Sequence, residues 1–146
     1  MTAYAPINPD FEALVRASFA RQTMMESAGA RMVSVIPGFV ELRAPILPTM
    51  RQQHDFGHGG LSFSLGDVAA GYSALTLQPP AHDVLTIEMK INFLAPAQGE
   101  ELIARGRVIR PGRRMVVVGA EVAAVDEDGK ETPVALLQGT MIPASL

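Results

Sequence analysis

One long helical segment, flanked by strand-like segments on both sides, most constrains how this chain can fold. Residues 58–77 form a helical pattern with few breakers, which ends at Pro79 and Pro80. Two strand-like segments precede it and four follow it, at residues 31–36, 39–44, 84–94, 101–110, 115–126 and 132–143. Residues typical of tight turns lie between the consecutive strand-like segments, at 37–38, 96–99, 111–112 and 128–129, and they predict hairpins. This order predicts an α+β fold in which about six antiparallel strands pack one face against the helix.

The N-terminal segment predicts an additional helix. Asn8, Pro9 and Asp10 are typical of a helix start, apolar residues follow at helical spacing, and Gly29 is typical of a helix end. The chain of 146 residues has about the size of one domain. We therefore expect a single domain over residues 1–146, with a helical segment at 1–29 and a core at 30–143.

Composition excludes several classes of protein. With 48% hydrophobic and 18% charged residues the chain can bury a core, so disorder is not its main state. A net charge of −3 argues against a general nucleic-acid binder. The absence of cysteine excludes disulfides, zinc–cysteine sites and thiol catalysis. No apolar run is long enough to span a membrane, and no signal peptide precedes residue 10, so we expect a cytoplasmic protein.

Asp67 is the unusual residue of the long helix. On a helical projection Leu61, Leu65 and Tyr72 belong to an apolar stripe, completed by Val68 and Leu75, that should lie on the sheet. Asp67 falls well off this stripe, and in mid-helix it can neither cap an end nor offset the helix dipole. Its surroundings on the projection are mostly small: Ser64, Gly66, Ala70, Gly71 and Ala74, with Phe63 beside them. Either Asp67 is a solvated helix position, or its carboxylate faces a cleft.

The turn that opens the helix favours the cleft. His58-Gly59-Gly60 places two glycines at the helix N-terminus, where free backbone N–H groups point at whatever binds. Such donors suit a carbonyl oxygen that becomes negative during acyl transfer. Asp67 follows about two turns later. Together the two features supply an oxyanion site and a base, which is the minimum for hydrolysing an activated acyl group.

The run from His58 to Ala74, HGGLSFSLGDVAAGYSA, resembles the signature of hotdog-fold acyl-CoA thioesterases of the phenylacetate-pathway (PaaI-like) type. The segment from Thr86 to Ala97 resembles the same family's strand that ends in Pro-Ala before a glycine turn. This resemblance covers residues 30–143 and implies a hotdog fold, in which the sheet wraps around the central helix. It also implies an obligate homodimer, with His-Gly-Gly of one subunit facing Asp67 of the other, and pairing of dimers into homotetramers.

The resemblance assigns roles to four residues. It implies that the Gly59 N–H polarises the thioester carbonyl, that Asp67 is the base or nucleophile, and that Thr86 helps to hold the water. Gln52 stands where the family often has an asparagine that contacts the substrate carbonyl. Asp55 stands where the family has a glycine, so this chain departs from the pattern twice within one loop.

Further residues are candidates for contacts with the substrate. His58 could touch the thioester or fix the turn by hydrogen bonding the backbone, and we favour the second role. We expect Gly60 and Phe63 beside the substrate. The arginines of the 101–126 hairpin form either a solvated strand face or a grip on coenzyme A phosphates, for which Arg113 and Arg114 are the best candidates. Phe11, Phe19 or Met24 could line an acyl pocket, although core packing is favoured; the histidine spacing supports no metal site.

The functional hypothesis is an acyl-CoA thioesterase that converts medium-chain or aryl acyl-CoA to free acid and coenzyme A. No metal, redox cofactor, nucleic acid or membrane partner is expected. The alternative is a non-catalytic acyl-CoA-binding hotdog protein, a sensor or scaffold, in which Asp67 is incidental. A hotdog dehydratase is a third possibility, but Asp67 with Gly59 and Gly60 fits hydrolysis better. The sequence leaves open whether Asp67 activates water or attacks the thioester itself.

Overall fold

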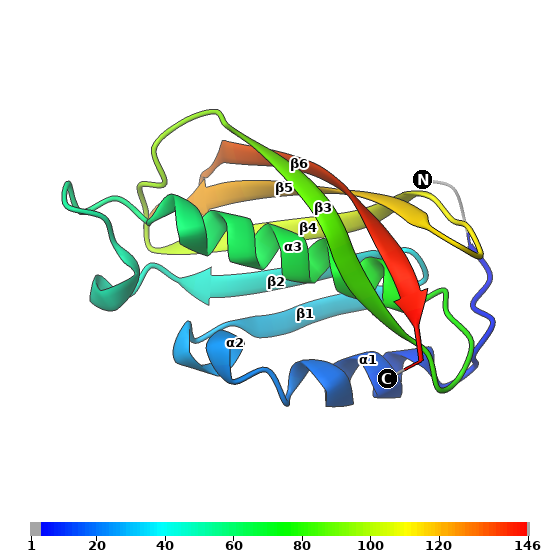
Figure 1. Cartoon of the computed structure of the whole chain (residues 1–146). Helices are drawn as coiled ribbons and strands as arrows, with labels where there is room; N and C mark the ends of the chain where they lie inside the picture. Colours follow the sequence, from blue (N-terminus) through cyan, green and yellow to red (C-terminus); the bar gives the residue numbers. More distant parts are fainter. Residues whose placement is uncertain (1–3, 146) are drawn as a thin grey trace.

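Six strands form one antiparallel sheet that wraps around a long helix (Figure 1). The computed structural model describes residues 4–145. Its elements are α1 (Phe11–Phe19), α2 (Thr23–Ser27), β1 (Arg31–Ile36), β2 (Phe39–Pro45), a 3₁₀ turn (Pro48–Met50), α3 (Gly59–Leu75), β3 (Asp83–Phe93), β4 (Glu101–Arg110), β5 (Val116–Val125) and β6 (Glu131–Ala144). The strand order is β1-β2-β4-β5-β6-β3. The predicted α+β fold with a six-stranded sheet around a central helix is therefore confirmed.

The position of β3 differs from the prediction. Turn chemistry at residues 96–99 predicts a hairpin between β3 and β4, and this is wrong because β3 pairs with β6 at the far edge of the sheet. The segment after β3 instead carries the chain back to the middle of the sheet, next to β2. Local turn residues specify a change of direction but not the strand that is met next. The outer edge of β3 is left unpaired and bears Leu85, Ile87 and Phe93, which are 44%, 55% and 58% exposed.

The helix α3 is buried on more than its apolar stripe because the sheet curves around it. Leu61, Leu65, Tyr72 and Leu75 are buried as predicted, whereas Val68 is only half-buried. Part of the small-residue face is buried too, and the backbone of β4 touches the helix there. A Cβ built on Gly106 would lie 2.1 Å from the Ala69 carbonyl carbon, so only glycine allows this approach.

The N-terminal segment forms two helices and not the single predicted one. α1 ends at Phe19, and α2 begins at Thr23 after Gln22 takes an extended backbone conformation (ψ 96°). The Gln22 side chain then donates a hydrogen bond to the Tyr72 hydroxyl on α3 (3.0 Å). This long-range contact is invisible in the local pattern. Gly29, with φ +66°, follows the end of α2 as predicted.

The outer face of the sheet, away from α3, carries a continuous chain of ion pairs. Residues of β4 alternate, so Gly106 faces α3 whereas Glu101 and Arg105 point outward. The pairs, with N–O distances, are Arg31–Glu101 (3.1 Å), Arg43–Glu101 (2.9 Å), Arg43–Glu41 (3.3 Å), Arg105–Glu41 (3.0 Å) and Arg105–Glu131 (2.7 Å). We call this set the outer ion-pair chain.

In the described part of the chain, no helix is long and apolar enough to cross a membrane.

Candidate active site

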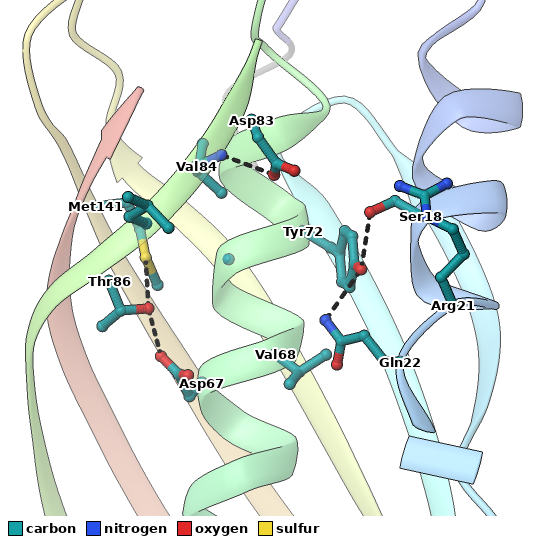
Figure 2. Close-up of a pocket in the computed structure, with 12 residues that line it drawn as sticks. Ser18, Arg21, Gln22, Asp67, Val68, Tyr72, Asp83, Val84, Thr86 and Met141 are labelled. Carbon is teal, nitrogen blue, oxygen red and sulfur yellow. Dashed lines mark hydrogen bonds between the residues drawn. The ribbon is translucent and has the colours of Figure 1, made fainter. Parts of the chain in front are cut away.

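A carboxylate and a hydroxyl meet between α3 and β3. Thr86 lies on the inner face of β3, opposite Met141 of β6, and Asp67 projects from the middle of α3 (Figure 2). The Thr86 hydroxyl donates a hydrogen bond to Asp67 Oδ1 (2.8 Å), and its oxygen lies 3.1 Å from Met141 Sδ. The structure therefore brings together two of the residues that the sequence selected.

The surroundings of Asp67 favour its neutral form. Burial raises the pKa of the half-buried Asp67 carboxyl above its ordinary value, and the hydrogen bond from Thr86 lowers it in part. No ion pair involves Asp67 among the residues that the structure describes. A partly desolvated carboxylate without a cation binds a proton more readily than a paired one. Asp67 therefore has the properties of a general base.

A cavity of about 430 Å³ extends from the Asp67–Thr86 pair to the N-terminal helices. Its far wall contains Ser18, Gln22 and Tyr72. The Tyr72 hydroxyl hydrogen bonds with the Ser18 hydroxyl (3.1 Å) and accepts one from the Gln22 amide (3.0 Å) (Figure 2). We call these three residues the Tyr72 cluster. They line the side of the cavity away from Asp67 (Figure 2).

The N-terminal end of α3 forms a second, separate feature. His58 Nδ1 accepts a hydrogen bond from the Gly60 N–H (2.8 Å), so His58 caps the helix and the Gly60 donor is already used. The Gly59 N–H has no acceptor among residues 4–145. A Cβ on Gly59 would lie 2.9 Å from Phe93 Cζ, so a side chain here would displace the phenyl ring. The one free donor at this helix end is thus the Gly59 amide.

Gln52 lies beside Gly59 in a cavity of about 490 Å³, but its side-chain oxygen is engaged within its own loop. That oxygen accepts a hydrogen bond from the His54 N–H. The loop also places Asp55 at φ +66°, a conformation that glycine adopts most easily. The glycine that the resembled family has at this position is thus explained by backbone conformation, which Asp55 reproduces here.

The two features lie too far apart to act on one atom within a single chain. Gly59 and Asp67 are eight residues apart on the same helix, which corresponds to about 12 Å along its axis. Their cavities share no lining residue. A thioester carbonyl bound to the Gly59 N–H of this chain is therefore out of reach of Asp67 of this chain.

The other predicted residues lie elsewhere. Phe63 packs half-buried against the core and lines neither of these cavities. Arg113 lines a third cavity, of about 590 Å³, together with His82, and Arg114 is exposed. Of the remaining arginines of the hairpin, Arg105 belongs to the outer ion-pair chain and Arg107 pairs with Glu121 (2.9 Å). No three His, Asp or Glu side chains of residues 4–145 are grouped to hold a metal ion.

Sequence reasoning overlooked the residues that line this side of the Asp67 cavity. For Phe11, Phe19 and Met24 it favours core packing over a lining role, and it names none of Ser18, Arg21 and Gln22, which the N-terminal helices contribute to the cavity. Phe19 instead packs edge-on against Tyr72, with ring centroids 6.0 Å apart, Phe11 packs on the core, and Met24 is 62% exposed. The available signal was Tyr72, because a buried tyrosine hydroxyl requires a hydrogen-bond partner.

Comparison with known proteins gives one family and many similar structures. The family model of the thioesterase superfamily matches residues 54–131. A thioesterase family protein from Silicibacter pomeroyi is 40% identical, with a TM-score of 0.90, over 93% of this chain and 99% of that one. The fold is shared with the Escherichia coli PaaI protein of the phenylacetic acid degradation operon (23% identity, TM-score 0.81, 94% and 96% covered). It is also shared with a Bacillus halodurans protein solved with CoA (21%, 0.74, 92% and 84%).

Curated relatives point the same way over a shorter stretch. A Saccharolobus solfataricus protein, named as a candidate esterase, is 41% identical over 73 residues, which are 50% of each chain. The chain thus spans about half the length of this relative, and 44% of a second one from the same organism. The resemblance seen in the sequence motifs is confirmed at the level of family and fold.

Proposed function

Since this chain belongs to the thioesterase superfamily, we propose that it is an acyl-CoA thioesterase, with Asp67 as its catalytic carboxylate. The observation that carries the proposal is the 2.8 Å hydrogen bond from Thr86 to an Asp67 carboxylate that forms no ion pair with the described residues. This pair can hold and deprotonate one water molecule. The CoA present in the structure of the Bacillus halodurans protein supports coenzyme A as the thiol of the substrate.

In the first of two routes Asp67 acts as a general base. Asp67 takes a proton from a water that Thr86 orients, and the water oxygen forms a bond to the thioester carbonyl carbon. The carbonyl electron pair moves to the oxygen, and the Gly59 N–H of a second subunit stabilises this oxyanion. When the carbon–sulfur bond breaks, Asp67 returns its proton to the leaving thiolate, giving free acid and coenzyme A.

In the second route Asp67 is the nucleophile. Its carboxylate attacks the carbonyl carbon, the CoA thiolate leaves, and the resulting mixed anhydride is hydrolysed by water. The routes differ in where oxygen from solvent enters. In a single turnover in H₂¹⁸O, hydrolysis of the anhydride at the Asp67 carboxyl would place ¹⁸O in the protein, whereas general-base catalysis places all of it in the product acid.

The 12 Å separation of Gly59 from Asp67 supports a site built from two subunits. In this arrangement Gly59 of the partner subunit polarises the thioester that Asp67 attacks. The unpaired β3 edge, with its exposed Leu85, Ile87 and Phe93, is suited to cover a second copy of the chain. We propose a homodimer on this basis, and a dimer of dimers as the larger assembly that the resemblance implies.

The remaining predicted residues have supporting roles in this proposal. His58 fixes the turn through the Gly60 N–H, and Gln52 shapes the loop beside Gly59. Arg113 and Arg114 are unpaired among the described residues and can bind CoA phosphates at the β4–β5 turn. The acyl group is a medium-length chain or an aromatic ring.

Thiol release from acyl-CoA esters of different lengths tests the activity. We expect wild-type turnover on at least one ester and a loss of about 10³-fold or more in Asp67→Asn, because the base is removed. Glu121→Gln removes a surface carboxylate and is the matched control, which should retain wild-type rates. Retained binding of acyl-CoA without turnover by the wild type would replace the enzyme with the alternative, an acyl-CoA-binding protein.

Mixing two inactive variants tests the shared site. Gly59→Ala displaces Phe93 and the oxyanion donor, which should lower the rate by roughly 10²–10³-fold. A mixed dimer of Gly59→Ala and Asp67→Asn contains one site with both wild-type groups. Random mixing makes half of the dimers mixed, so about a quarter of wild-type activity should return. No recovery in verified mixed dimers would show that the two residues do not serve one site.

A further inference from the structure

Gly71 has a position that neither packing nor backbone conformation explains. It lies on α3 one turn after Asp67 and lines the same cavity. A Cβ added to it would meet only Met141 Cε, at the ordinary contact distance of 3.8 Å. Its φ is not in the left-handed region, so any residue could adopt its conformation. Glycine is nevertheless one of the least favourable residues for a helix interior, and something other than the fold must require it here.

Gly66, on the same helix, shows what a packing requirement looks like. A Cβ at this position would lie 2.8 Å from both Cδ atoms of Leu137 on β6, so the buried Leu137 side chain has to move to accept it. Gly66 is buried, whereas Gly71 is half-buried and borders open space. Of these two glycines, one accommodates the sheet and the other leaves part of the cavity empty.

The empty space at Gly71 is bounded on one side. The Tyr72 cluster lines the side of the cavity away from Asp67, and its polar groups already satisfy one another, so it borders the space without requiring a polar ligand. From Asp67 to Tyr72 the helix rises about 7.5 Å. An extended carbon chain advances about 1.2 Å per bond, by analogy with the extended backbone, so a chain that runs along the helix from Asp67 to Tyr72 spans about six carbons or a single aromatic ring.

We propose that Gly71 keeps open the space for the substrate's acyl group, and that the Tyr72 cluster limits this group to about six carbons or one ring. The inference rests on the proposed thioesterase function and adds the residues that set the size of the acyl group. The acyl group lies on the subunit that supplies Asp67, between α3, β3 and the N-terminal helices. Gly71 and the Tyr72 cluster are thus specificity-determining residues.

Binding of CoA thioethers tests the space without depending on turnover. S-methyl-CoA is too short to reach residue 71, whereas the chain of S-hexyl-CoA should extend past residue 71 to the Tyr72 cluster. Titration calorimetry should show S-hexyl-CoA binding about tenfold weaker in Gly71→Ala and about 10²-fold weaker in Gly71→Val. Binding of S-methyl-CoA should change less than threefold. Equal weakening of both ligands, or no weakening of S-hexyl-CoA, would overturn the proposal.

Two control measurements separate specificity from folding. Gly71→Ala should raise Tm by about 2–4 °C, because alanine favours the helix and meets no clash. Gly66→Ala should lower Tm and leave the ratio of S-hexyl-CoA to S-methyl-CoA affinity unchanged. A Gly71→Ala variant that is less stable than wild type would show that the glycine serves the fold, against the inference.

Opening the wall should have the opposite effect. In the double variant Ser18→Ala and Gln22→Ala, S-decyl-CoA should bind at least tenfold more tightly than in wild type, since the cavity is extended beyond the Tyr72 cluster. Unchanged S-decyl-CoA binding would contradict the length limit. If these binding results are obtained but no ester is hydrolysed by the wild type, the thioesterase proposal fails and the acyl cavity stands. If esters are hydrolysed at rates that do not depend on residue 71, the thioesterase stands and the acyl cavity is excluded.

Discussion

Asp67 and Glu131 are two carboxylates of one small protein whose surroundings give them opposite properties. Glu131, on the outer face, accepts two hydrogen bonds from the Arg105 guanidinium (2.7 and 2.8 Å), and these lower the pKa of its carboxyl. Asp67, in the cavity, has a neutral hydroxyl as its only hydrogen-bond partner among residues 4–145, and burial raises the pKa of its carboxyl. The difference teaches that burial without a counter-ion among the described residues raises the pKa of a carboxyl, which is the property that the proposed catalytic role requires.

The two regions also differ in how fully their groups are used. The outer ion-pair chain alternates three arginines and three glutamates across the sheet, so each charge has an opposite neighbour. In the cavity region, the Gly59 N–H and the β3 edge are unused by the described residues. The first region is complete in one chain, and the second offers contacts to something that binds.

Among the changes that test this difference between the two regions, removing the hydroxyl partner of Asp67 should have the largest effect, and it should lower turnover. Thr86→Val keeps the shape of the side chain but deletes the donor, so water loses one of its two anchors and turnover should fall by about 10–10²-fold. The rates of thiol release measure it. Thr86→Ser retains the hydroxyl and should recover most of the activity. A Thr86→Val variant as active as wild type would exclude this residue from the site.

The pH dependence of turnover should report the raised pKa of Asp67. The reaction requires the ionised carboxylate, so kcat/KM should fall as the pH drops through a pKa that lies above the ordinary carboxyl range. Thr86→Val should move this midpoint to still higher pH, because the hydrogen bond from Thr86 favours the charged form. The measurement is a pH–rate profile of both proteins. A midpoint that is the same in the two would contradict the assignment.

Neutralising the two carboxylates should change stability in opposite directions. Because the pKa of Asp67 is raised in the folded protein, its protonated form favours folding, and this stabilisation is lost as the pH rises from the unfolded-state pKa through the folded-state pKa. At neutral pH the ionised carboxylate therefore lowers the free energy of unfolding, and Asp67→Asn should stabilise the protein. The lowered pKa of Glu131 means that its contribution is present above the unfolded pKa and lost as the pH falls through the folded one. Glu131→Gln should therefore destabilise at neutral pH, by about 0.2–1 kcal/mol for a pair this exposed.

Denaturation of both variants at neutral and acid pH measures these changes. The two differences from wild type should shrink together in acid, where both carboxyls are protonated in the folded and the unfolded protein. If both variants changed the free energy of unfolding in the same direction at neutral pH, the proposed difference between Asp67 and Glu131 would be contradicted.

The exposed Arg107–Glu121 pair should give the smallest effect. Its side chains are 46% and 60% exposed, so Arg107→Gln should cost less than about 0.5 kcal/mol. Urea denaturation at low and high salt checks this value, and thiol release should remain at the wild-type rate. A tenfold loss of turnover in Arg107→Gln would indicate that CoA phosphates bind to arginines on the strand face and not at the β4–β5 turn.

Elements with strong local patterns could be predicted from the sequence. The bounds of α3 and of the β1–β2 hairpin follow from apolar periodicity and turn residues within each segment. The proximity of Asp67 to Thr86 came from the motif resemblance, since nothing in the spacing of the two residues requires it. His58 as the cap of α3 was also favoured in advance, because a turn residue can satisfy the free N–H groups of the helix.

Features that depend on distant contacts could not be predicted. The place of β3 beside β6 is determined by pairing over about 50 residues, and turn chemistry carries no information about it. The break between α1 and α2 follows from the bond between Gln22 and Tyr72, which are distant in the sequence. The ion pairing of Arg105 is likewise a property of facing strands, so residue type alone could not separate it from Arg113.

The contact of Gly106 with α3 has a consequence for how this molecule can diverge. Because the β4 backbone at Gly106 contacts α3 at Ala69, the distance between α3 and β4 is as short as two backbones allow. Any side chain at residue 106 would push the helix away. Substitutions that change the size of the proposed acyl cavity are therefore expected away from this contact. We expect descendants of this chain to vary at residue 71 and in the N-terminal helices, and to keep residue 106 unchanged.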